Sequence, residues 1–117
     1  MKYVDHKHPE WIEGDGYKKR ILLREDSLNC PGTLVQLVRI EPRAVVADHY
    51  HKSCTEVFYG MSGSGVFEIN GEAFNLSSGD VLTCEPFEIH NTKNSGYEPL
   101  IYVVFKTNVT EKDLYWC

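Results

Sequence analysis

Short runs of alternating hydrophobic and polar residues, rich in β-branched and aromatic side chains, recur along most of this chain. Side chains alternate between the two faces of a strand, so such runs predict half-buried β-strands. Turn-forming residues separate the runs, and Asn70-Gly71 is the clearest signal because Asn-Gly favours the type I′ turn of a hairpin. The strands are predicted over residues 17–23, 34–40, 45–51, 56–61, 65–70, 72–76, 80–84 and 100–107.

Helical patterns are nearly absent from the sequence. Residues Thr110–Leu114 predict one terminal helical turn, with Thr110 as its cap and Asp113 at the third position. The first 16 residues are expected to wrap the domain or to supply an outer strand. Many short strands with closely spaced turns predict an all-β fold, either a barrel or a two-sheet jelly roll.

The length of 117 residues favours a single domain spanning positions 1–117. A formal net charge of −5 argues against a nucleic-acid partner, because phosphate binding requires clustered lysine and arginine. The only compact basic run is Lys18-Lys19-Arg20, with Arg24 just beyond it. It is interpreted as a solvated strand end, and contact with an anionic substrate is the minor alternative.

The opening residues lack the apolar run of a signal peptide, and no later run could span a bilayer. A cytoplasmic location without a membrane partner is therefore the expectation. The chain has no C-x-x-C pair, so its cysteines are expected to be free thiols in a reducing compartment. These are Cys30, Cys54, Cys84 and Cys117.

Potential metal ligands are concentrated in the segment from His49 to Glu56. Residues two apart on a strand point the same way, so His49 and His51 would share one face while Tyr50 points to the other. A returning strand could then bring Glu56 to the same place, and His90 follows much later. Imidazole and carboxylate ligands together suit a transition metal.

Two segments resemble the sequence motifs of the cupins. In the first, His49 and His51 are followed by Glu56 after four intervening residues and by Gly63 after six more. The second is similar to residues 79–94, where Gly79 opens a strand and three residues separate His90 from Asn94. The resemblance runs from about residue 42 to 105. It implies a double-stranded β-helix, the jelly-roll barrel of the RmlC-like cupins.

This chain departs from the cupin pattern in the loops and not at the predicted ligands. Arg43 replaces the glycine that commonly begins the first motif. In the second motif Pro86 falls one residue late, and Phe87-Glu88 stand where a glycine is usual. The departures concern the path of the loops at the mouth of the barrel.

The resemblance implies that His49, His51, Glu56 and His90 hold a divalent transition-metal ion, which could be iron, manganese, nickel, zinc or copper. Four ligands would leave two positions of an octahedral ion open for water or substrate. The alternative is an emptied site, in which these polar side chains bond to one another or to water. Phe58, which shares its strand face with Glu56, and Phe67 are expected to form an aromatic wall of the pocket.

Three functions remain open at this level. The first is a metal-dependent enzyme, of dioxygenase or isomerase type, that acts on a small polar molecule such as a sugar or carboxylate. The second is a non-catalytic, metal-dependent binding module for such a ligand, and the third is an accessory protein with a structural barrel. The run Glu56–Gly60 is similar to small cupins loosely likened to mannose-6-phosphate isomerase. A homodimer formed through outer sheets and N-terminal strands is also expected.

Overall fold

Nearly all regular structure in this protein is β-strand, and the computed structural model describes residues 1–117. Only one helix is present, α1 (Glu25–Leu28); with four residues it cannot span a membrane, and no longer apolar helix exists. The strands are β1 (Ile12–Glu13), β2 (Lys18–Arg24), β3 (Leu34–Ile40), β4 (Val45–Tyr50), β5 (Thr55–Ser62), β6 (Ser64–Ile69), β7 (Glu72–Ser77), β8 (Val81–Cys84), β9 (His90–Lys93), β10 (Leu100–Thr107) and β11 (Tyr115–Trp116).

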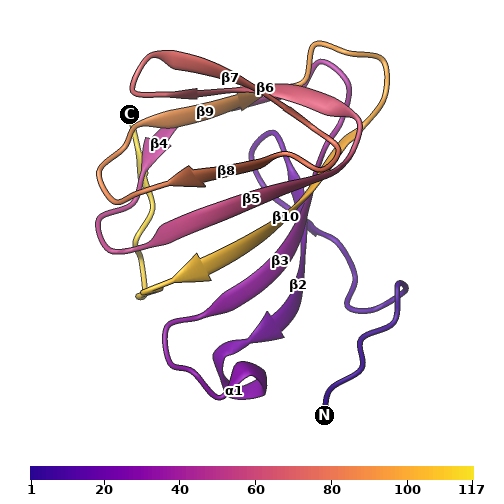
Figure 1. The fold of residues 1–117 in the computed structure, drawn as a ribbon, viewed down its shortest axis with the longest axis vertical. Coiled ribbons are helices and arrows are strands. Elements are labelled where there is room, and N and C mark those ends of the chain that lie inside the picture. The colour runs from indigo at the N-terminus through magenta and orange to yellow at the C-terminus, as the bar shows by residue number, and fades with distance from the viewer.

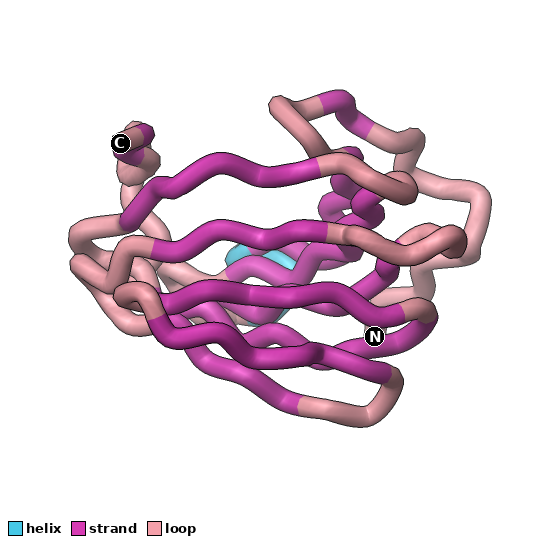
Figure 2. The backbone as a smooth tube through the Cα atoms, turned by 90° about the horizontal axis from the view of Figure 1, so that it is seen from above, coloured by secondary structure: helices cyan, strands magenta, loops and turns pink.

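The strands form two antiparallel sheets that face each other (Figure 1 and Figure 2). One has six strands in the order β1-β2-β3-β10-β5-β8, and the other has five in the order β11-β4-β9-β6-β7. The chain therefore passes repeatedly between the sheets, from β3 to β4, from β5 to β6 and from β9 to β10. This arrangement is the double-stranded β-helix that the sequence predicts.

Every predicted strand is present, but the short elements between them were missed. The strand β9 carries buried polar side chains at His90, Asn91 and Thr92, so it lacks the alternation that marks the other strands. The helical turn predicted over Thr110–Leu114 is wrong. This segment contains only a turn, and the Asp113 carboxylate instead accepts hydrogen bonds from another loop.

The hydrophobic core lies between the two sheets. The six-stranded sheet contributes Ile40, Leu100 and Val104, while Phe67 and Leu76 come from the five-stranded sheet, and all five side chains are at most 1% exposed. Strand alternation explains why these residues are buried, because the side chains at the positions between them point to the outer face of the sheet. The core fixes the spacing of the sheets and hence the place where polar residues can enter between them.

The interpretation of the basic run Lys18–Arg20 as a solvated strand end is wrong for two of its three residues. Arg20 is 6% exposed, because its guanidinium donates four hydrogen bonds to backbone carbonyls of residues 5–9 in the N-terminal segment. Lys19 faces the space between the sheets. Only Lys18 lies outside, beside Glu13 and Glu41.

Both loop positions that depart from the cupin glycines keep a left-handed backbone. Arg43 has φ of 68° and Phe87 has φ of 69°, values that cost a residue with a Cβ roughly 1–2 kcal/mol. Gly63 shows why a glycine persists elsewhere, since a Cβ there would collide with the carbonyl oxygen of Pro99. The loops thus follow a glycine-type path even where the glycine is lost.

Arg43→Gly is expected to raise the free energy of unfolding by up to about 1 kcal/mol, because the relief of left-handed strain exceeds the extra chain entropy that glycine loses on folding. Arg43→Val should instead lower it by about 1 kcal/mol, since a β-branched residue tolerates this conformation poorly. Arg43 is exposed, so neither change alters the core. Urea unfolding followed by tryptophan fluorescence tests this, and equal stability of the two variants would contradict it.

Candidate metal centre

The strand register brings the predicted ligands together from both sheets. On the five-stranded sheet His49 of β4 is paired directly with His90 of β9, so the two side chains share a face. A register shift between Val46 and His49 marks a bulge, which re-aims the end of β4. On the six-stranded sheet Glu56 of β5 faces inward between its partners Lys106 and Cys84.

Four side chains converge where the sheets meet. Ligand atoms of His49, His51 and His90 all lie within 4.8 Å of one another. The Oε1 atom of Glu56 lies 2.9 Å from His51 Nε2 and 3.3 Å from His90 Nε2. Two ligands at right angles on an ion with bonds of about 2.1 Å are about 3 Å apart, so these separations suit neighbouring ligands of one ion.

The second ring nitrogen of each histidine is held by a backbone carbonyl. His49 Nδ1 lies 2.7 Å from the oxygen of Ala47, His51 Nδ1 lies 2.6 Å from that of Asp113, and His90 Nδ1 lies 2.9 Å from that of Glu88. A carbonyl oxygen only accepts, so each Nδ1 carries the proton. The three Nε2 atoms are left as lone-pair donors, as in metal sites where outer contacts fix the imidazole tautomer.

The polar atoms at the centre are not satisfied by the protein itself. Glu56 is 5% and His90 is 2% exposed, yet Glu56 Oε1 and His90 Nε2 have no hydrogen-bond partner of acceptable geometry. Unpaired buried polar atoms are costly, so a network of mutual hydrogen bonds does not explain the arrangement. The donor set and its unsatisfied atoms fit a divalent transition-metal ion.

Burial and charge shift the pKa values of these groups. Burial alone would raise the pKa of Glu56, but the approach of His51 and His90 and the charge of Lys106 hold it below its ordinary value. Burial opposes protonation of His51 as well, yet the Glu56 carboxylate raises its pKa. Burial, followed by repulsion from His90, lowers the pKa of His49 to about 4. Glu56 is therefore anionic and His49 neutral near pH 7.

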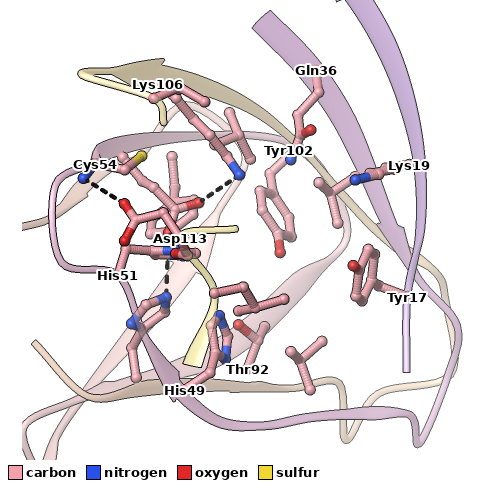
Figure 3. Close-up of a pocket in the computed structure, with 18 of the residues that line it drawn as sticks. Tyr17, Lys19, Gln36, His49, His51, Cys54, Thr92, Tyr102, Lys106 and Asp113 are labelled. Atoms are coloured by element: carbon pink, nitrogen blue, oxygen red, sulfur yellow. Dashed lines mark hydrogen bonds and ion pairs between the residues drawn. The ribbon is translucent and has the colours of Figure 1, made fainter. Parts of the chain in front are cut away.

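A cavity of about 280 Å³ opens beside this centre (Figure 3). Phe58 lines this cavity, and its ring lies 5.1 Å from that of Phe67. Phe67 is fully buried behind Phe58 and belongs to the core and not to the cavity wall. Lys106 reaches into the cavity, and its Nζ lies 3.7 Å from Glu56 Oε2.

The segment after β10 closes one side of the cavity and positions the metal ligand His51. The Asp113 carboxylate accepts hydrogen bonds from the backbone N–H groups of Lys52, Ser53 and Cys54, at 2.7, 3.0 and 3.1 Å. These bonds hold the pKa of Asp113 low against the opposing effect of burial. Since the Asp113 carbonyl also accepts from His51, this one residue fixes both the loop and the imidazole.

Sequence reasoning missed several polar residues of the cavity. Gln36 and Lys106 could have been found from strand alternation, because they share the inward face with Val38 and Val104 respectively. Asp113 carried no such signal, since it lies outside any strand and its partners are 59–61 positions away.

Comparison with known proteins identifies the family. Residues 36–106, more than half of the chain, match the family model described as Cupin domain. The chain therefore belongs to the cupin family. A structure described as an RmlC-like cupin from Shewanella frigidimarina superposes with a TM-score of 0.79 at 17% identity, covering 95% of this chain and 94% of the other. At that identity the likeness concerns the fold alone.

Two relatives of described function are similar to this chain in sequence. An oxalate-binding protein of Thermotoga maritima is 28% identical over 82 residues, which cover 70% of this chain and 68% of the relative. A 5-nitrosalicylic acid 1,2-dioxygenase of Bradyrhizobium sp is 28% identical over 75 residues. That match covers 63% of this chain but only 36% of the dioxygenase.

Asp113→Ala is expected to lower the free energy of unfolding by about 1–3 kcal/mol, because three N–H groups lose their acceptor. The variant Glu111→Ala, an exposed carboxylate two residues earlier, is the control and should stay within about 0.5 kcal/mol of the parent. Chemical unfolding of both variants measures the difference. Equal stability of the two would show that the Asp113 contacts do not hold the loop.

Proposed function

We propose that this protein is a metal-dependent enzyme, of dioxygenase or isomerase type, whose ion is held by His49, His51, Glu56 and His90. The observation that carries the proposal is the convergence of three Nε2 lone pairs and one carboxylate, with every Nδ1 already bound by a carbonyl. A set made only of acceptors is stable when a cation lies among them.

When bound, the ion supplies a Lewis acid that polarises a ligand oxygen or activates dioxygen. The residues of this chain hold the ion and shape the space for its ligand. The Glu56 carboxylate raises the pKa of His51, so a cation bound at the centre competes with a proton for this imidazole. Lys106 beside Glu56 offers a positive charge to an anionic ligand. The substrate class favoured by this charge is a small carboxylate or sugar acid.

A non-catalytic binding module is the second candidate, and the name of the Thermotoga relative, an oxalate-binding protein, supports it. The dioxygenase relative supports the enzyme. Incubation of the metal-loaded protein with oxalate separates the candidates. Binding that leaves oxalate intact under air favours the module, whereas loss of oxalate or consumption of oxygen that requires both metal and oxalate favours the enzyme.

His90→Ala should abolish most of the metal-dependent stabilisation while the β fold remains. Metal at 100 times its Kd stabilises the folded state by about 2.7 kcal/mol, or roughly 10 °C in Tm. Loss of one ligand should weaken binding by at least about 100-fold, so the same metal concentration would shift Tm little.

The matched control is His6→Ala, which removes an exposed histidine from the N-terminal segment. Thermal melting of both variants, with and without each divalent ion, gives the comparison. If His90→Ala retains the metal-dependent shift of the parent protein, His90 is not a ligand.

We also propose a homodimer formed through the outer face of the six-stranded sheet. Tyr59, Val81 and Phe105 lie on the neighbouring strands β5, β8 and β10 and face away from the core. These large apolar side chains form an exposed patch of the kind that marks interaction surfaces. A second copy of the same face matches it in polarity, and a two-fold dimer would bury it.

Tyr59→Lys is expected to convert the dimer into a monomer, because a charge would be buried at the interface. The control Phe74→Lys makes the same kind of change on β7 of the other sheet and should remain dimeric. Light scattering coupled to size-exclusion chromatography reports the masses. A monomeric parent protein at micromolar concentration would overturn this proposal.

A further inference from the structure

The cavity continues beyond the metal centre to a second polar end on β2 and β3. Lys19 and Gln36 line this distal end, and Figure 3 shows them with Tyr17 on the side of the cavity away from His49 and His51. Lys19 is paired with Val38, and Gln36 lies two residues before Val38 on β3, so both side chains point inward. The outward neighbour Lys18 lies on the opposite face of the sheet.

Both groups of the distal end are without a protein partner. Gln36 is 5% exposed, and its Oε1 atom has no hydrogen-bond partner. Lys19 forms no ion pair, whereas Lys18 and Lys106 each lie beside a carboxylate. The charges that act on Lys19 come from Lys106 and Arg24, and both are positive.

The charge balance of this end favours an anion. Burial lowers the pKa of Lys19, and the neighbouring positive charges lower it further, so a negative group beside it would be stabilised. Gln36 offers an amide that can donate to a carboxylate oxygen and accept from a water or hydroxyl. At about 280 Å³ the cavity is close to the lower end of the range for ligand pockets, about 300–1,000 Å³.

We propose that Lys19 and Gln36 bind a carboxylate at the far end of a ligand whose other end approaches the metal centre. This inference rests on the proposed function and narrows its substrate class to acids with two anionic ends.

Calorimetric titration of the metal-loaded protein with lactate, malate and 2-hydroxyglutarate tests the proposal. The protein is loaded with whichever divalent ion stabilises it most. The three probes share an α-hydroxycarboxylate group, which can approach the metal, and differ in whether a second carboxylate follows and at what distance. Either malate or 2-hydroxyglutarate should bind at least about tenfold more tightly than lactate, as expected for a charge-assisted contact.

Lys19→Met removes the charge and keeps the length of the side chain, and Gln36→Glu places a carboxylate in the distal end at nearly the same shape. Each should reduce the advantage of the second carboxylate to less than about threefold and leave lactate binding within about twofold. Lys18→Met on the outer face is the matched control and should bind all three probes as the parent does.

The outcomes separate this inference from the proposed function. If lactate binds but a second carboxylate adds no affinity, the distal carboxylate site does not exist. The same conclusion follows if Lys19→Met and Gln36→Glu weaken lactate and the dicarboxylates by equal factors. If no divalent ion binds the parent protein, the proposed function fails and the inference fails with it. If the loaded protein binds none of the three probes, the inference alone is overturned.

Discussion

The buried carboxylate of Glu56 is the constraint on which the rest of the site depends. Moving an anion between two sheets costs several kcal/mol unless positive charge surrounds it. Here His51 and His90 lie within 3.3 Å of its Oε1, and Lys106 lies 3.7 Å from its Oε2. The imidazoles contribute full charge only when protonated. A divalent ion satisfies the carboxylate and all three imidazoles together, and the fold brings ligands from both sheets to a single point.

The same constraint explains why the C-terminal segment contributes to the centre. His51 lies just after β4 and so is not held by the sheet. Asp113 replaces that support, because its carbonyl fixes the imidazole and its carboxylate fixes the backbone of residues 52–54. Loop order, imidazole tautomer and ligand position are thus coupled through one residue. A substitution of Asp113 should therefore disturb the position of His51 as well as the backbone of residues 52–54.

Strand alternation was enough to predict the residues whose side chains follow it. The shared face of Glu56 and Phe58 is an example, because β5 is regular over that stretch. The joint position of His49 and His90 came from the motif resemblance, since β9 has no apolar alternation to reveal it. The inward direction of Lys19 was missed, because three consecutive basic residues show no alternation of apolar and polar positions. Only the pairing of Lys19 with Val38 of β3 reveals which face of β2 is inward. Contacts distant in sequence, such as those of Asp113, left no local pattern.

Elemental analysis of protein purified without an affinity tag or chelator shows whether His49, His51, Glu56 and His90 hold an ion. We expect about one divalent transition-metal ion per chain, since one donor set is present. The ion should be removable by dialysis against a chelator and should return when the same ion is supplied again. Protein that contains no transition metal, and takes none up when excess ion is supplied at neutral pH, would show that these four residues do not form a metal site.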